Sequence, residues 1–328
     1  MTFQILCLSG GGFLGLYSAA VAAAIEEETG RPLGDSFDLI AGTSVGGIIA
    51  LGLAAGTPAA RIRDAFIERG GDIFSDRPPP NWLGEGWQLL TGVAKARYPQ
   101  KQLRATVDAI VPREMTLGDL GKPVLIPAVN LTKGQPQVFK TAHHPSFKRD
   151  WRLAVADVAL ATSAAPTFFP IHHIGGEMFA DGGLYANSPD QIALHEAEHF
   201  LKRSVAEIRM LSIGTTTSSF SFSNAIGHNL GSWGWMKRQR LTSAMIASQQ
   251  LNTDYMMQHR LGDHYVRIDR IQSKEQERQL RLDVASRAAI ADLLALAEAS
   301  VREHLPRAAT QNILSHWAPP ATFHHRGN

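Results

Sequence analysis

The amino-acid sequence predicts an α/β protein with a mostly parallel central sheet, helices on both faces as a three-layer sandwich, and a helical C-terminal portion. Two observations predict it. The chain opens with a strand, a glycine loop, a helix, a second strand, a serine turn and a second helix, and this order indicates parallel strands with helices covering the sheet. Beyond about residue 220, apolar residues recur mainly at helical spacing.

Composition narrows the class of protein. The 328 residues suffice for one large domain or two modest ones, and 44% hydrophobic with 19% charged residues is typical of a globular chain. A net charge of +2 provides no general field for polyanions, so we expect no nucleic-acid polymer as partner. With Cys7 as its single cysteine and no signal peptide at its start, the chain is expected in a reducing cytoplasm.

The first strand and helix enclose a glycine loop with two functional interpretations. Residues 3–8 are a buried strand, Gly10, Gly11 and Gly12 follow, and a small-residue helix ends near Gly30. The loop fits G-x-G-x-x-G, which favours a dinucleotide-binding protein, but no second strand ends in the acidic residue expected about twenty positions on. The alternative is an oxyanion hole, in which successive backbone N–H groups stabilise a developing alkoxide.

Ser44 is the apex of a G-x-S-x-G turn between a predicted strand (residues 37–40) and an Ala/Gly-rich helix. Such an elbow holds a nucleophilic serine in a strained turn above a helix N-terminus; the alternative is a serine that only caps the helix. Residues 39–56 carry no charge, but their glycines and the absence of aromatic belts favour a buried helix over a membrane span.

The middle of the chain contains predicted elements and one unusual loop. We expect helices at 59–69 and 99–111 and strands at 122–129 and 137–140. Three prolines with Trp82 and Trp87 indicate a loop outside the core, either a lid, a lipid-facing surface or a rigid connector. His143 and His144 lack carboxylates at ligand spacing, so we expect no metal and no cofactor.

Residues 154–194 are the second stretch rich in motifs. A small-residue helix is expected to break at Pro166, and a short strand then ends in the tight turn that begins at Asp181. Asp181 is either an ordinary turn former or a chemical partner for Ser44. Asn187 to Asp190 resemble a helix start.

Together these motifs resemble patatin-like phospholipases over about residues 4–215. The resemblance rests on four motifs in the family's order: Gly10-Gly11-Gly12-x-x-Gly15, Gly42 to Gly47, Ala164-Ala165-Pro166 with Phe169-Pro170, and Asp181-Gly182-Gly183 with Asn187-x-Pro189. It implies that Ser44 is the nucleophile, that Asp181 is its only partner without a histidine, and that Gly10, Gly11 and Gly12 form the oxyanion hole. The family often has Arg or Lys where Leu14 stands, so an anion-anchoring contact is not expected there.

A dyad of serine and aspartate makes a physical demand on the site. An ordinary aspartate is too weak a base for a serine hydroxyl at pH 7, so burial should raise the pKa of Asp181. The neighbouring Phe179, Ala180, Gly182 and Gly183 provide no cation and little polarity. We therefore expect a buried carboxylate.

The remaining chain divides into a helical extension and a tail. A catalytic domain over 1–215 ends with the strand at 208–214, residues 216–305 form a helical extension with a possible strand near 264–270, and 306–328 read as a frayed tail. The segment from Trp233 to Leu241 mixes aromatic and basic residues. A plain basic helix face is favoured there over membrane docking or an anionic regulator's site.

The C-terminal portion and the glycine loop are most similar to bacterial patatin-like effectors of cyclic-oligonucleotide anti-phage signalling. This resemblance implies a phospholipase that a cyclic dinucleotide activates and that acts on phospholipid at the inner membrane from the cytoplasm. A homodimer is left open. The leading hypothesis is a serine acyl hydrolase, and the alternatives are a dinucleotide-binding protein and a non-catalytic interaction protein.

Overall fold

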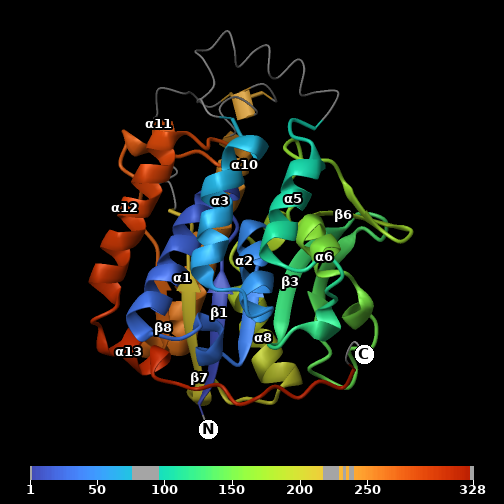
Figure 1. Ribbon diagram of the computed structural model, residues 1–328, viewed down its shortest axis with the longest axis vertical. Coiled ribbons are helices and arrows are strands. Elements are labelled where there is room, and N and C mark those ends of the chain that lie inside the picture. Colours follow the sequence, from blue (N-terminus) through green and yellow to red (C-terminus); the bar gives the residue numbers. More distant parts are fainter. Residues whose placement is uncertain (1, 76–95, 217–228, 232–233, 236–239, 326–328) are drawn as a thin grey trace.

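The computed structural model describes residues 2–75, 96–216, 229–231, 234–235 and 240–325, and Figure 1 shows their arrangement. The loop with Trp82 and Trp87 and most of the segment from Trp233 to Leu241 lie outside these ranges. The strands are β1 (Phe3–Leu8), β2 (Leu39–Gly42), β3 (Val124–Asn130), β4 (Gln135–Lys140), β5 (His172–Ile174), β6 (Glu177–Asp181), β7 (Ile208–Ile213) and β8 (Tyr265–Ile268). The helices are α1 (Gly15–Thr29), α2 (Val45–Ala54), α3 (Ala59–Ile73), α5 (Gln100–Ile110), α6 (Val155–Thr162), α7 (Gly183–Ala186), α8 (Asp190–His195), α10 (Arg240–Leu261), α11 (Gln276–Gln279), α12 (Arg287–His304) and α13 (Ala308–Leu314).

In the described chain, eight strands form one sheet in the order β5-β6-β3-β2-β1-β7-β8, and β4 also pairs with β3. The pairs β1–β2, β1–β7, β2–β3 and β7–β8 are parallel, whereas β4 and β6 run antiparallel to β3. The mostly parallel sheet is confirmed. Strand β5 was not expected, because its three residues are too short to show a period.

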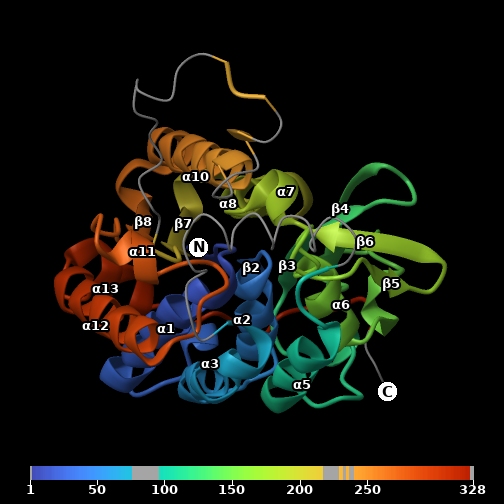
Figure 2. The ribbon, with the colours of Figure 1, turned by 90° about the horizontal axis from the view of Figure 1, so that it is seen from above.

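Helices cover both faces of the sheet, which confirms the three-layer architecture (Figure 2). Side chains of β1 alternate between two apolar clusters, with Leu6 and Leu8 packing on the face of α1 and α2 and Ile5 and Cys7 on the opposite face. This alternation follows from the two-residue period of a strand, and both faces are buried because the strand is central. Two apolar layers therefore hold the sheet.

The uncharged stretch around Ser44 is a strand followed by a buried helix. All ten residues of α2 are buried, and its glycines let backbones approach closely. Among the described residues, no helix has both the length and the apolar character that crossing a bilayer requires.

Gly46 shows how tight this packing is, and we expect Gly46→Ala to lower the free energy of unfolding by about 3 kcal/mol or more. A Cβ at Gly46 would lie 2.3 Å from the carbonyl oxygen of Leu8, so backbone would have to move. Gly71 is the matched control, because a Cβ there meets no atom within 4 Å and Gly71→Ala should stabilise the helix by roughly 1 kcal/mol. Urea unfolding of both variants measures the difference, and equal stability would contradict the packing.

One helix boundary differs from expectation. Helix α6 ends at Thr162, before Pro166, and the chain then turns through Thr167, which has a φ of 73°. The possible strand near 264–270 is present as β8, which extends the parallel sheet beside β7, while α10 covers one face and α12 packs on α1.

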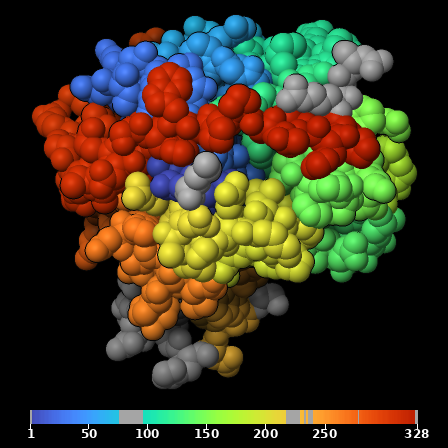
Figure 3. Space-filling model, turned by 90° about the horizontal axis from the view of Figure 1, so that it is seen from below, coloured from blue at the N-terminus to red at the C-terminus, as the bar shows by residue number. Residues whose placement is uncertain are grey.

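The structure differs from the expected frayed tail at 306–328. Helix α13 buries Ile313 and Leu314, and the following segment crosses the lower face of the molecule (Figure 3). The segment is anchored by the N–H of Ala318 on the carbonyl of Asp35 and by His316 Nε2 at 3.2 Å from Asp38 Oδ2. Its polar and proline-rich composition gave no sign of these long-range anchors.

Candidate active site

Ser44 lies in a strained turn between β2 and α2. Its φ of 55° and ψ of −126° are unusual for a residue with a side chain. Thr162 fixes the turn, because its Oγ1 accepts the N–H of Ser44 at 3.0 Å and donates to the carbonyl of Pro127 at 2.6 Å. Strain of this kind persists only where the surroundings impose it, and it is concentrated at functional sites.

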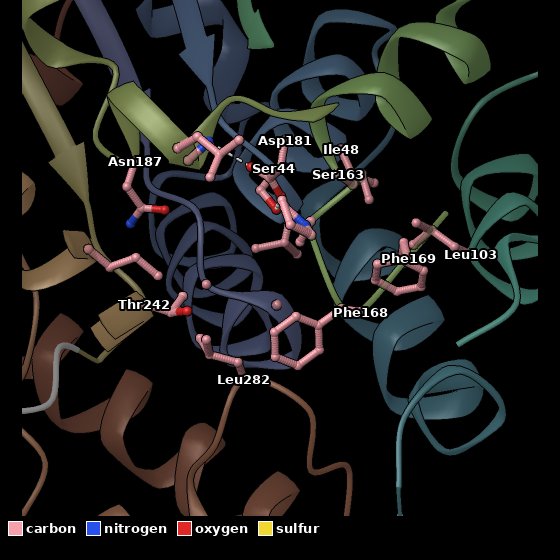
Figure 4. Close-up of a pocket in the computed structure, with 18 of the residues that line it drawn as sticks. Ser44, Ile48, Leu103, Ser163, Phe168, Phe169, Asp181, Asn187, Thr242 and Leu282 are labelled. Atoms are coloured by element: carbon pink, nitrogen blue, oxygen red, sulfur yellow. Dashed lines mark hydrogen bonds between the residues drawn. The ribbon is translucent and has the colours of Figure 1, made fainter. Parts of the chain in front are cut away.

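Asp181 ends β6 directly beside Ser44, although 137 positions separate them in the chain. The hydroxyl of Ser44 donates to Asp181 Oδ2 at 2.7 Å, and the N–H of Gly183 donates to Oδ1 at 2.6 Å. A Cβ at Gly182 would lie 2.3 Å from the carbonyl oxygen of Pro127, which explains a glycine after the aspartate. Figure 4 shows the two side chains facing each other.

The carboxylate of Asp181 is buried, as the sequence predicted. Burial raises the pKa of Asp181 to about 6, because the charged form loses its hydration, while the hydrogen bonds from Ser44 and Gly183 oppose the shift. A carboxylate with this pKa is largely ionised at pH 7 and is a better proton acceptor than an exposed one. The pair therefore has the protonation states that proton transfer from Ser44 needs.

The glycine loop lies next to Ser44 because β1 and β2 are adjacent parallel strands. Gly10 does not offer its N–H to the cavity: it donates to the carbonyl of Asn187 at 2.9 Å. The carbonyl of Gly10 accepts from Asn187 Nδ2 and Thr215 Oγ1. Within the described residues, the N–H groups of Gly11 and Gly12 have no such partner, so two of the three expected donors are available.

The glycines of this loop are packed tightly against other parts of the protein. A Cβ at Gly11 would lie 2.3 Å from Thr215 Oγ1, one at Gly12 2.3 Å from the carbonyl oxygen of Leu282, and one at Gly15 2.3 Å from Val45 Cγ2. These glycines are required by close protein packing. Leu14 is buried in the core, so no cation stands at its position.

An apolar cavity opens beside Ser44 and Asp181. Helices α2, α3, α5, α7 and α10 and the segments after α3, α6 and α11 supply its apolar walls, listed here: Val45, Ile48, Phe66, Ile73, Phe74, Leu103, Ala165, Pro166, Phe168, Phe169, Leu184, Met245, Ile246 and Leu282. Ser163 and Thr242 add hydroxyls. No histidine is among the described residues that line it, and a hydrocarbon chain fits such walls.

Both ring nitrogens of His143 lie within hydrogen-bond distance of other side chains of the protein. Its Nδ1 lies 2.8 Å from Thr141 Oγ1 and its Nε2 3.1 Å from Glu196 Oε1, in a buried group that also contains Lys140. Burial lowers the pKa of His143. Over the described ranges, no group of three metal-ligating side chains occurs.

Several site residues escaped sequence reasoning. Thr162 and Thr215 hold the elbow and the glycine loop from distant strands and helices, and α10 supplies Thr242, Met245 and Ile246 to the cavity. Asn187 was noted as part of a motif, but its bracing of Gly10 needs the fold. Threonines and methionines of this kind carry no local pattern, so no signal could have found them.

The fold and the site together define the class of protein. A family model described as "Patatin-like phospholipase" matches residues 6–194, more than half of the chain, and the chain belongs to this family. It is therefore a patatin-like phospholipase, a carboxylic ester hydrolase. The alternatives of a protein whose function is to bind a dinucleotide through the glycine loop, and of a non-catalytic interaction protein, are set aside.

Three relatives that match most of the chain carry a narrower description than the family model does. A "cGAMP-activated phospholipase" of Pseudomonas aeruginosa is 39% identical over 329 residues, covering 100% of this chain and 96% of that protein. Proteins of the same description from Vibrio cholerae and Escherichia coli are 39% and 36% identical, covering 88% and 89% of this chain and 88% and 86% of theirs.

Proposed function

We propose that the chain hydrolyses acyl esters of membrane phospholipids through a covalent acyl intermediate on Ser44. The observation that carries this proposal is the 2.7 Å hydrogen bond from Ser44 to buried Asp181 at the wall of an apolar cavity. Lipid-product analysis of wild type against Ser44→Ala tests it, with released fatty acid and lysophospholipid as the expected products of wild type only.

In the acylation step, Asp181 acts as the general base. As Ser44 Oγ attacks the ester carbonyl carbon, its proton passes to Asp181 Oδ2, and the carbonyl oxygen becomes an oxyanion. The N–H groups of Gly11 and Gly12 stabilise that oxyanion, while Gly10 holds the loop against Asn187. Asp181 then gives the proton to the leaving alcohol, and the acyl group stays on Ser44.

Deacylation repeats the sequence with water. Asp181 takes a proton from water as the hydroxide attacks the acyl carbonyl, and the same proton returns to Ser44 Oγ when the fatty acid leaves. Asp181 Oδ2 then again accepts the hydroxyl of Ser44, and Oδ1 still accepts the N–H of Gly183. The cycle needs no histidine, because one buried carboxylate handles the proton in both steps.

The cavity wall sets the acyl chains that fit, and we expect Leu103→Phe to discriminate against long chains. Leu103 is buried on α5 and lines the cavity on the side of Phe169 (Figure 4). A larger ring removes room for methylenes, so the rate ratio of decanoyl to butyryl nitrophenyl ester should fall roughly 10- to 200-fold. Leu103→Ala should leave or raise that ratio, and the same fall in both variants would refute the assignment.

We propose further that a cyclic dinucleotide activates this chain, because relatives of 36–39% identity over most of its length are described as cGAMP-activated. Activation would place the enzyme at the cytoplasmic membrane surface, where its substrate lies. Phospholipid hydrolysis measured with a panel of cyclic dinucleotides should rise with cGAMP, and unchanged rates across the panel would refute this regulation.

A further inference from the structure

A polar hollow at the opposite end of the molecule from Ser44 is not used by the catalytic proposal. It measures about 420 Å³ and lies between the ends of α1, α12 and α13, with Glu28, Arg31, Gln311, Ser315 and Trp317 among its lining residues. Trp317 is 66% exposed. The hollow therefore presents a large aromatic face next to polar groups.

The two faces of Trp317 are not equivalent. The guanidinium carbon of Arg31 lies 4.6 Å from the ring centroid, a cation–π contact that holds the indole in place. The Nη1 of Arg31 is buried and has no hydrogen-bond partner within the described chain. One face of the indole is thus supported while much of the ring stays open, which is the arrangement of a stacking platform.

The charges of the hollow decide what kind of ligand fits. Arg31 and Glu28 are its one basic and one acidic side chain, so it gives no net attraction for a polyanion. Affinity must come from stacking and from hydrogen bonds to a flat polar ring. Gln311 and Ser315 supply an amide and a hydroxyl, and Glu28 supplies an acceptor for N–H groups.

We propose that this hollow binds a purine base of the activating cyclic dinucleotide, stacked on Trp317. The assignment rests on the proposed activation, and it adds the place and the chemistry of recognition. Base–aromatic stacking typically contributes about 1–3 kcal/mol, which corresponds to roughly 5- to 150-fold in affinity.

Two helices connect the hollow with the active site. Helix α1 begins at Gly15, directly after the glycine loop, and Arg31 follows its end; α12 begins after Leu282 and ends beside Leu305. The carbonyl of Leu282 accepts the N–H of Phe13 at 2.8 Å. The helices lie side by side (Figures 1 and 2) and share a buried hydrogen bond from Tyr17 to Ser300.

This geometry makes the hollow suitable for regulation. At 1.5 Å per residue, the two helices are about 22 and 27 Å long. Helix α1 runs from the glycine loop to the hollow, and α12 connects the hollow with the segment of Leu282, which contacts that loop. A ligand that shifts Arg31 or Leu305 can therefore act on Gly11 and Gly12 through rigid, packed elements.

The test uses the full chain, cGAMP as ligand, calorimetric binding and phospholipid hydrolysis. Trp317→Leu should raise the Kd roughly 5- to 150-fold and the activating concentration with it, whereas Trp317→Phe should lie between it and wild type. Trp151→Leu is the matched control, because Trp151 stacks on His325 elsewhere on the same segment and does not line the hollow. Basal hydrolysis of a short-chain ester should be unchanged in all three and shows that they fold.

Ser315→Leu provides a variant that keeps Trp317 and fills part of the hollow, and it should weaken binding as well. If wild type binds cGAMP while Trp317→Leu and Ser315→Leu bind it equally well, the site lies elsewhere and activation itself stands. If wild type neither binds nor responds to cGAMP, the regulation and this site are both overturned.

Discussion

Ser44→Ala should lower kcat/KM for a phospholipid ester by roughly 10⁴-fold or more, because removing the nucleophile removes the covalent route and leaves only the remaining site groups. The fold should persist, since alanine keeps the Cβ and the turn is held by Thr162 and not by the hydroxyl. Mass-spectrometric detection of fatty acid measures the loss, and a fluorophosphonate probe should label wild type alone.

Ser163→Ala is the matched control for this variant. Ser163 lines the same cavity and is buried, but within the described chain its hydroxyl has no hydrogen-bond partner. Its removal should leave hydrolysis and labelling near wild-type values. Retained hydrolysis in Ser44→Ala, or an equal loss in Ser163→Ala, would overturn the assignment of the nucleophile.

Asp181→Asn should be comparably inactive and, at neutral pH, more stable. Asparagine has nearly the same shape and can still accept the N–H of Gly183, but it cannot take the proton of Ser44. Loss of activity with a gain of stability would separate a chemical role from a structural one, since a structural residue loses both.

The pH dependence of that stability follows from the raised pKa of Asp181. The carboxyl titrates near 3.8 when unfolded and near 6 when folded, so the folded state binds more protons between these values. Its contribution to stability is full below about pH 4 and is lost as pH rises through about 6. Relative to wild type, Asp181→Asn should gain roughly 3 kcal/mol at pH 7.5 and about 1 kcal/mol at pH 4.5. Urea unfolding at both pH values measures the gain, and an equal gain at both would contradict the burial of the charge.

The pH dependence of wild-type activity should also report the ionisation of Asp181. Because only ionised Asp181 accepts a proton, kcat/KM should be level above about pH 6 and fall tenfold per pH unit below it. A soluble short-chain ester is the suitable substrate, since its own charge does not change there. A fall centred near pH 4 would indicate an ordinary, hydrated carboxylate.

Local patterns in the sequence predicted most of the architecture. Apolar runs of strand length, the glycine loop and the Ala/Gly-rich helix at 45–54 specify their elements almost unaided, because period, turn residues and close packing are properties of neighbouring residues. The elbow at Ser44 is equally local. The pairing of Ser44 with Asp181 was inferred from the order of four motifs and not from contact.

Tertiary structure alone decided the rest, because those features depend on residues that are distant in the chain. The hydrogen bond that occupies the N–H of Gly10 requires Asn187, the bracing of Ser44 requires Thr162, and the anchored C-terminal segment requires Asp35 and Asp38. The pKa of Asp181 likewise depends on burial by elements from the whole domain. Sequence by itself determined which groups are present at the sheet edge, and the fold determined which of their hydrogen bonds remain available for chemistry.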